Sequence, residues 1–264
     1  MIHFLRRLAA VLIAVLALSA AAAAGGALQG TGVVFLHGKG VWPGAFDGGI
    51  GASLAAEGAM VETPELPWSF SRIYDATYEQ AMSEIDAAVR GLRARGATRL
   101  IVIGHSLGAN AAIGYAARGA RIDALVVIAP GHLPETDRLR RHTADARAEA
   151  TALIAAGKGN ARRTFPDLVQ GIPSFCTATP LVYLSMFDPN GAAVIPKNIA
   201  AMPAIPLLWV VGTFDPINSR GRDYAFARAP PHPKSRYLEV FASHLTTALV
   251  ARSRVVEWVM GLER

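Results

Sequence analysis

The stretch RLIVIGHSLGAN, residues 99–110, decides the fold, because an apolar run stops there at a glycine and a serine follows between two glycines. The run has no alternation of polar and apolar residues, which is typical of a strand buried on both faces of a sheet. The residues after Ser106 have helical spacing over 107–118. Gly104-His105-Ser106-Leu107-Gly108 therefore predicts a sharp turn from strand to helix, with glycines where Cβ atoms would collide with the neighbouring backbone.

Such a turn gives Ser106 a special position. It raises the hydroxyl above the sheet and places it at a helix N-terminus, where free N–H groups and the helix dipole favour negative charge. Both features suit a nucleophile whose attack on a carbonyl creates an oxyanion. A serine that only caps a helix after a glycine-rich turn is the alternative.

Strands and helices alternate along the rest of the chain. Apolar runs predict strands at 32–37, 59–64, 99–104, 123–129, 206–212 and 236–241. Longer segments predict helices at about 44–58, 74–95, 107–118 and 246–262. Apolar strands that alternate with helices indicate an α/β fold, with a mostly parallel sheet of about six strands covered by helices on both faces.

One region interrupts this alternation, because no buried strand is predicted between Gly131 and Met202. Residues 133–156 have the pattern of an Arg-rich amphipathic helix, and prolines divide the following segment into short pieces. We interpret about 132–180 as a helical cap inserted at the carboxyl edge of the sheet, where open α/β sheets bind ligands. A lid over the site is the functional interpretation, and a structural elaboration of the fold is the alternative.

A serine nucleophile needs a general base, and the base needs a carboxylate that orients it. His244, in FASHLTT, stands directly after the last predicted strand. Asp215, in TFDP, follows the strand at 206–212, although an aspartate before proline is also common in Asx turns. Asp188, in SMFDPNG, is the rival acid, and no predicted strand precedes it.

The oxyanion would need two N–H donors. One candidate is the backbone N–H of Leu107, the residue after the nucleophile. The other is the backbone N–H of Lys39, in the loop His37-Gly38-Lys39-Gly40 after the first strand, whose glycines allow a close backbone approach. We interpret the Lys39 side chain itself as a surface charge.

Three further residues are candidates for substrate binding. Trp42 follows the loop at 37–40, His132 stands at the start of the cap, and Phe214 adjoins the predicted acid. Each could equally be a packing residue. Cys176 is the only cysteine, so no intramolecular disulfide can form, and we interpret it as a small buried hydrophobic residue.

Taken together, these residues resemble the α/β-hydrolase-fold serine hydrolases, the esterase- and lipase-like superfamily. The resemblance extends from Gly32 to the C-terminus and rests on the HGKG loop, the GHSLG elbow, the Asp215 loop and the terminal His244, in the order Ser, Asp, His. It implies a small member with a cap, and the N-terminal segment at 1–24 indicates that this member is exported. Two departures stand out: the family's full sheet has two more strands before the strand that leads into the HG loop, so we expect a minimal six-stranded core here, and HGKG replaces the HGGG of many lipases and esterases.

What the resemblance implies is acyl transfer to water. Ser106 would attack a carboxylic ester or related acyl compound, His244 would serve as the base and Asp215 would orient it, with no metal or organic cofactor. An acyltransferase with the same triad is one alternative. A catalytically inactive module that binds a small ligand is another.

Composition narrows the class of protein. Hydrophobic residues make up 52% of the 264 residues and charged residues 17%, which indicates a globular fold. The formal net charge is +6, yet the basic residues are not interleaved with aromatic residues that could stack on bases. We therefore expect a small-molecule ester or acyl substrate as the partner, and no nucleic acid.

The N-terminus has the pattern of a secretory signal peptide at 1–24. MIHFLRR is a positively charged start, LAAVLIAVLALS an apolar core, and the alanines after it are small enough for cleavage. We therefore expect a periplasmic or secreted protein, with no stable membrane insertion once the signal is removed. An uncleaved N-terminal membrane anchor is the alternative, because the apolar stretch is nearly long enough to span a bilayer.

Overall fold

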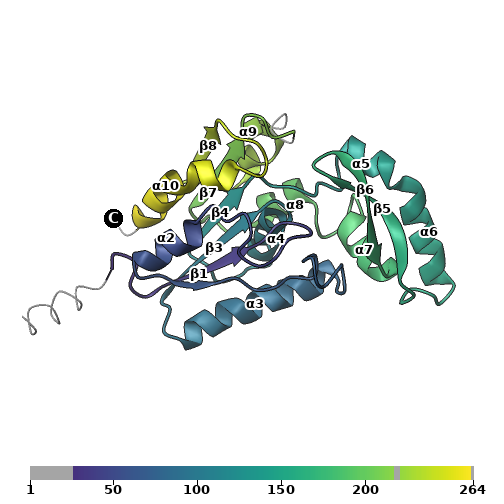
Figure 1. Cartoon of the computed structure of the whole chain (residues 1–264), viewed down its shortest axis with the longest axis horizontal. Coiled ribbons are helices and arrows are strands. Elements are labelled where there is room, and N and C mark those ends of the chain that lie inside the picture. Colours follow the sequence, from purple (N-terminus) through teal and green to yellow (C-terminus); the bar gives the residue numbers. More distant parts are fainter. Residues whose placement is uncertain (1–25, 217–220, 263–264) are drawn as a thin grey trace, which may run out of the picture.

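A computed structural model describes residues 26–216 and 221–262, with a six-stranded parallel sheet at its centre (Figure 1). The predicted signal peptide at 1–24 lies outside the described residues. All strand pairs in this sheet are parallel, which confirms the predicted α/β architecture. In spatial order the strands are β2 (Met60–Glu62), β1 (Thr31–Leu36), β3 (Arg99–His105), β4 (Ala124–Ile128), β7 (Leu207–Gly212) and β8 (Arg236–Val240).

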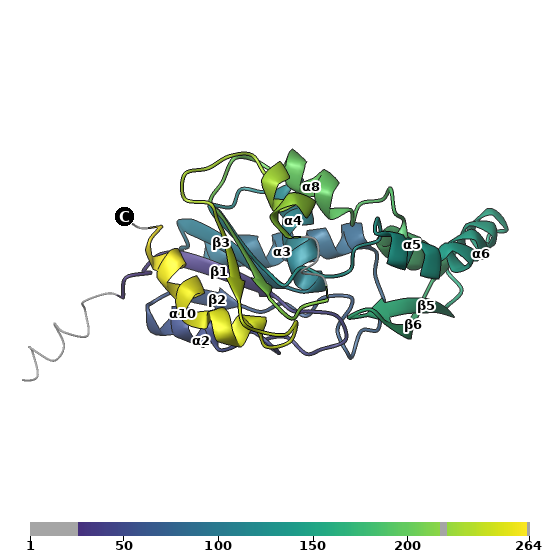
Figure 2. The ribbon, with the colours of Figure 1, turned by 90° about the horizontal axis from the view of Figure 1, so that it is seen from above.

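Helices cover both faces of the sheet, as the apolar strands require (Figure 2). The residues of β1, β4 and β7 are buried throughout. One face carries α2 (Ile50–Ala56) and α10 (Thr247–Met260). The other carries α3 (Tyr78–Ala94), α4 (Leu107–Ala116) and α8 (Ile195–Ala201), and the short elements α9 (Gly221–Tyr224) and η2 (Phe226–Arg228) precede β8.

Helix starts are later than the spacing predicted, for local reasons. The helix expected from about residue 44 begins only at Ile50, because Gly48 and Gly49 take positive φ angles that end the preceding turn. The helix expected from residue 74 begins at Tyr78, because Thr77 forms a capping box with Gln80. No helix within the described ranges is long and apolar enough to cross a membrane.

The predicted cap region forms a separate group of elements at one end of the sheet, in both views (Figures 1 and 2). It consists of α5 (Asp137–His142), α6 (Ala144–Ala155), the antiparallel hairpin of β5 (Arg163–Val169) and β6 (Ile172–Ala178), and α7 (Pro180–Phe187). The prediction of a single helix at 133–156 is therefore wrong, because the helix is interrupted at Thr143, which lies between α5 and α6.

The β5–β6 hairpin was not predicted. Pro166 and Pro173 predict breaks in this segment, but a two-stranded ribbon has only edge strands, where proline is tolerated. Gln170 and Gly171 form the two-residue turn with φ angles of 50° and 79°, as primed hairpin turns require. The turn lies beside the carboxyl edge of the main sheet, because its residue Gln170 lines the same cavity as Ser106.

One side chain of α4 joins the two ends of the cap region. The buried Asn110 donates hydrogen bonds from Nδ2 to the carbonyl oxygen of His132, where the cap begins, and to that of Ala193, where the chain returns to the core. The Tyr78 hydroxyl donates to Asn110 Oδ1 and fixes the amide orientation. We call this arrangement the Asn110 clamp.

Candidate active site

The strand-to-helix turn at Ser106 has the strained backbone that the sequence predicts. Ser106 has φ 56° and ψ −120°, a conformation that residues other than glycine rarely adopt. A Cβ at Gly104 would collide with the Gly108 carbonyl group, and a Cβ at Gly108 would collide with the Leu36 carbonyl oxygen. Glycine is therefore required at both positions for β1, β3 and α4 to pack this closely.

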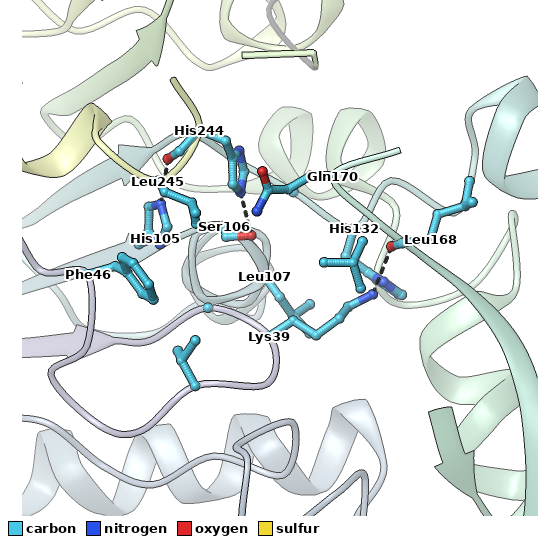
Figure 3. Close-up of a pocket in the computed structure, with 14 residues that line it drawn as sticks. Lys39, Phe46, His105, Ser106, Leu107, His132, Leu168, Gln170, His244 and Leu245 are labelled. Carbon is cyan, nitrogen blue, oxygen red and sulfur yellow. Dashed lines mark hydrogen bonds between the residues drawn. The ribbon is translucent and has the colours of Figure 1, made fainter. Parts of the chain in front are cut away.

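The three residues predicted as a triad lie within hydrogen-bond distance (Figure 3). Ser106 Oγ is 2.9 Å from His244 Nε2, and His244 Nδ1 is 2.7 Å from Asp215 Oδ2. Because a carboxylate only accepts, Nδ1 carries the proton in the neutral imidazole and Nε2 is left to accept from the serine hydroxyl. His244 and Asp215 are only 3% and 5% exposed, so water does not compete for the hydrogen bond between them.

These residues meet because parallel strands end at one edge of the sheet. Ser106 follows β3, Asp215 follows β7 and His244 follows β8. The rival acid Asp188 lies elsewhere, at the end of α7, where its side chain accepts from the backbone N–H of Asn190 in a local turn. Asp188 has no contact with His244.

His105, inside the elbow, contacts the loop that carries His244 in a way that the sequence analysis did not foresee. Its Nε2–H donates to the backbone carbonyl oxygen of His244 over 3.1 Å, so β3 holds the loop that carries the predicted base. Burial, reinforced by neighbouring His244, lowers the pKa of His105 to about 4, which keeps it neutral. The residue therefore positions His244 without adding charge to the site.

The predicted oxyanion loop is fixed by His37. Its Nδ1–H donates to the Gly38 carbonyl oxygen over 2.8 Å, and its Nε2 accepts from the backbone N–H of Leu66 over 3.0 Å. Burial lowers the pKa of His37, which favours this neutral form. A peptide N–H points away from the carbonyl of the same planar unit, so the Lys39 N–H faces away from His37.

Both predicted oxyanion donors are free to bind a ligand. Neither the Lys39 N–H nor the Leu107 N–H donates a hydrogen bond to another group in the part of the chain that the structure describes. Both residues line the cavity that contains Ser106, and a Cβ at Gly38 would come within 3.2 Å of the Ser106 Cβ. The loop thus comes close to Ser106.

The interpretation of the Lys39 side chain as a surface charge was wrong. Its ammonium group lies 2.8 Å from both carboxylate oxygens of Asp167 in β5, and 3.3 Å from the Leu168 carbonyl oxygen. The side chains of the pair are 12% and 2% exposed. Asp167 is 128 residues away in the sequence, so no local pattern could have revealed the pair.

The cavity at Ser106 has a volume of about 60 Å³. Of the predicted substrate contacts, His132 lines it, whereas Trp42 and Phe214 do not. Trp42 is 55% exposed against Phe70, and Phe214 is 61% exposed against Phe241, so each ring packs on an aromatic neighbour outside the cavity. The sequence analysis missed other residues that line it, among them Val41, Phe46, Gly131, Leu168, Val169, Gln170 and Leu245.

His132 has a structural position as well as a place in the cavity wall. Its φ angle is 59°, and its Nε2–H donates to the Met186 carbonyl oxygen over 2.8 Å. Burial, with a smaller effect of the nearby Lys39 charge, lowers its pKa to about 4.

Within the described residues, no group of three or more His, Cys, Asp or Glu side chains is arranged to hold a metal ion.

Comparisons with known proteins identify the family of the chain. The model of the alpha/beta hydrolase family matches residues 33–257. No curated protein sequence matches the chain. The monoacylglycerol lipase of Paleococcus ferrophilus has a similar structure, with a TM-score of 0.64 and 21% identity over 87% of this chain and 94% of that one.

Two further solved structures are similar at lower identity. One is described as LipS and LipT, two metagenome-derived lipolytic enzymes, with a TM-score of 0.64 and 15% identity over 89% of this chain and 94% of that one. The other is Est1E from Butyrivibrio proteoclasticus, with a TM-score of 0.57 and 12% identity over 89% and 88%. At such identities the likeness establishes the fold. With the family model covering most of its length, the chain belongs to the alpha/beta hydrolase family.

Proposed function

We propose that this chain is a serine hydrolase that cleaves carboxylic esters through Ser106, His244 and Asp215. The observation that carries the proposal is the continuous hydrogen-bonded chain from Asp215 through His244 to Ser106, which ends in a cavity next to two free backbone N–H groups. A nucleophile, an oriented base and two oxyanion donors are the parts that acyl transfer requires.

The proposed reaction has two halves. Ser106 Oγ attacks the ester carbonyl carbon while His244 Nε2 takes the hydroxyl proton, and the N–H groups of Leu107 and Lys39 stabilise the oxyanion. His244 then gives the proton to the leaving alcohol oxygen, which leaves an acyl group on Ser106. Water attacks this acyl-enzyme with His244 again as the base, and the acid and the free serine are regenerated.

The cavity supports a small acyl group. Its volume of about 60 Å³ is well below the 300–1,000 Å³ that is usual for sites of drug-sized ligands. The hairpin residues Leu168, Val169 and Gln170 lie over it and limit the length of the group that fits beside Ser106. We therefore expect acetate esters to be cleaved faster than octanoate esters.

The test is hydrolysis of p-nitrophenyl acetate, butyrate and octanoate by the purified chain and by Ser106→Ala. We expect the mutant to lose at least ~100-fold in turnover, because loss of a triad member removes several orders of magnitude. Ser83→Ala, at an exposed serine on α3, is the matched control. Equal rates for wild type and Ser106→Ala would refute the proposal.

A fluorophosphonate probe then separates the remaining alternatives. Labelling of Ser106 without ester hydrolysis would favour an acyltransferase, to be tested with added alcohols as acceptors. An absence of labelling would favour an inactive ligand-binding module.

We also propose that residues 1–24 export the chain. The charged start, the apolar core and the run of alanines support this proposal. Expression of the full chain in a Gram-negative host and N-terminal sequencing of the product would test it. We expect a mature N-terminus close to residue 25 in the periplasmic fraction, whereas an intact Met1 in the membrane fraction would favour the anchor.

A further inference from the structure

We propose that the Lys39–Asp167 ion pair is a positioning device that holds the oxyanion loop in register with the cap hairpin, so that Lys39 contributes to the reaction through its side chain as well as its backbone. This inference rests on the proposed function of Ser106. It assigns a role to Asp167, which has no contact with the triad in the structure.

The first observation is that the Lys39 ammonium group has a hydrogen-bond acceptor for each of its three N–H donors. Lys39 Nζ donates to both oxygens of the Asp167 carboxylate and to the Leu168 carbonyl oxygen, so its three N–H donors are all directed at β5. It also lies 5.6 Å from the centre of the Phe187 ring in α7. Figure 3 shows the side chain extending from the loop toward Leu168 and away from Ser106.

The second observation is that the pair is shielded from water. Asp167 is 1% exposed, and its Oδ1 also accepts from the backbone N–H of Leu168. Exposed ion pairs are loosely held and screened by salt, whereas a buried pair with further hydrogen bonds has one defined geometry. A charge pair in this environment can therefore fix the distance between two segments.

The third observation concerns the segments that the pair joins. On one side is Lys39, whose backbone N–H is one of the two proposed oxyanion donors. Lys39 lies between two glycines, and these residues do little to restrict the conformation of the loop. His37 and the Gly40 N–H, which donates to the Trp68 carbonyl oxygen, hold the loop to the core. Among the residues that the structure describes, the Lys39 side chain makes the hydrogen bonds of this loop with the cap.

On the other side of the pair, the hairpin continues directly into the cavity wall. Asp167 is followed by Leu168, Val169 and Gln170, all of which line the cavity at Ser106. The labelled Gln170 side chain lies beside Ser106 and His244 in Figure 3. If the pair is broken, the oxyanion donor and this wall lose their fixed separation. Oxyanion contacts matter in the transition state, so kcat should fall more than KM rises.

The experiment compares Asp167→Asn, Lys39→Met and the double variant in steady-state hydrolysis of p-nitrophenyl acetate by the full chain, with active sites counted by fluorophosphonate labelling. We expect kcat per active site to fall about 10-fold or more in each single variant, with KM changed less than about 3-fold, since deletion of a whole oxyanion donor costs about 10²–10³. The double variant should lose no more than the worse single variant, because both act through one interaction. The double variant also leaves no buried charge unpaired, so it should fold even where a single variant does not. Its kcat then tests the positioning role by itself.

Two kinds of control separate positioning from general stability. Asp167→Glu and Lys39→Arg keep the charges and should recover at least about a third of wild-type kcat, because the ion pair can re-form. Glu62→Gln breaks the exposed Arg95–Glu62 pair, away from the site, and should leave kcat unchanged.

The outcomes are distinct. Unchanged kcat in the double variant, additive losses, or a loss that appears only as a higher KM would overturn the positioning role while the esterase proposal stands. An absence of Ser106-dependent turnover in the wild type would overturn the proposed function and this role with it.

Discussion

Two buried histidines are expected to make the fold sensitive to acid. The structure keeps His105 and His132 neutral, and burial lowers the pKa of each from 6.5 to about 4. A group with a lowered folded pKa binds protons more readily in the unfolded chain, so acid favours unfolding. Above pH 6.5 both histidines are neutral in the folded and the unfolded chain, and the free energy of unfolding has its full value. As the pH falls from 6.5 toward 4, this free energy decreases, because only the unfolded chain binds the protons.

The magnitude follows from linkage. Inside this window each histidine lowers the free energy of unfolding by about 1.4 kcal/mol per pH unit. Between pH 7.5 and pH 4.5 the loss is about 2.5 kcal/mol for each residue and about 5 kcal/mol for both. That is a large part of the 5–15 kcal/mol by which domains are usually stable.

Urea unfolding at pH 7.5 and pH 4.5 would measure this effect in the wild type, in His105→Asn, in His132→Asn and in the double variant. Comparison of the four proteins isolates the contribution of the two substituted histidines from that of the rest of the chain. Each single variant should reduce the pH-dependent loss by about 2.5 kcal/mol, and the double variant by about 5 kcal/mol. The same pH dependence in wild type and double variant would refute the reasoning.

Three shorter predictions concern single residues. Asp215→Asn should lower kcat about 10⁴-fold with the fold intact, because an amide can favour the wrong tautomer of His244; a loss under about 10-fold in steady-state kinetics would show that another group orients the base. Gly131→Ala adds a Cβ that would lie 2.8 Å from Ser106 Oγ, so we expect the hydroxyl to rotate away from His244 and kcat to fall at least ~10-fold without a change in melting temperature; unchanged kcat would contradict this. Burial raises the pKa of Cys176 to about 12, so the native thiol should resist Ellman's reagent until the chain unfolds, and rapid labelling of the folded protein would argue against a closed hairpin.

The parts of the site that the sequence predicts are those with a local signal. Ser106 is marked by its flanking glycines, and Asp215 and His244 by apolar strands that end just before them. Parallel strands bring such positions to one edge whatever their separation along the chain. That is why short patterns could pick out three side chains that lie within hydrogen-bond distance although they are spread over more than a hundred residues.

The rest depends on tertiary contacts that leave no local pattern. The partner of Lys39 is decided by where the cap hairpin lies, and the hairpin itself was hidden by prolines that normally indicate breaks. The role of His105 depends on its hydrogen bond to the His244 carbonyl oxygen, a contact that no sequence pattern predicts. Trp42 and Phe214 follow strand ends where substrate contacts are expected, but their rings pack on exposed aromatic neighbours outside the cavity.

The Asn110 clamp has a consequence for how substrate preference can change in this scaffold. Because one core amide binds the chain at His132 and again at Ala193, the intervening residues begin and end at fixed points that do not depend on their own content. The entropy of closing a loop grows only slowly with its length, so inserts of different size between these points cost the core little. Grafting other caps between the two anchors, with Asn110, Tyr78 and a carboxylate partner for Lys39 retained, is therefore a route to new specificities that leaves the sheet and Ser106 unchanged.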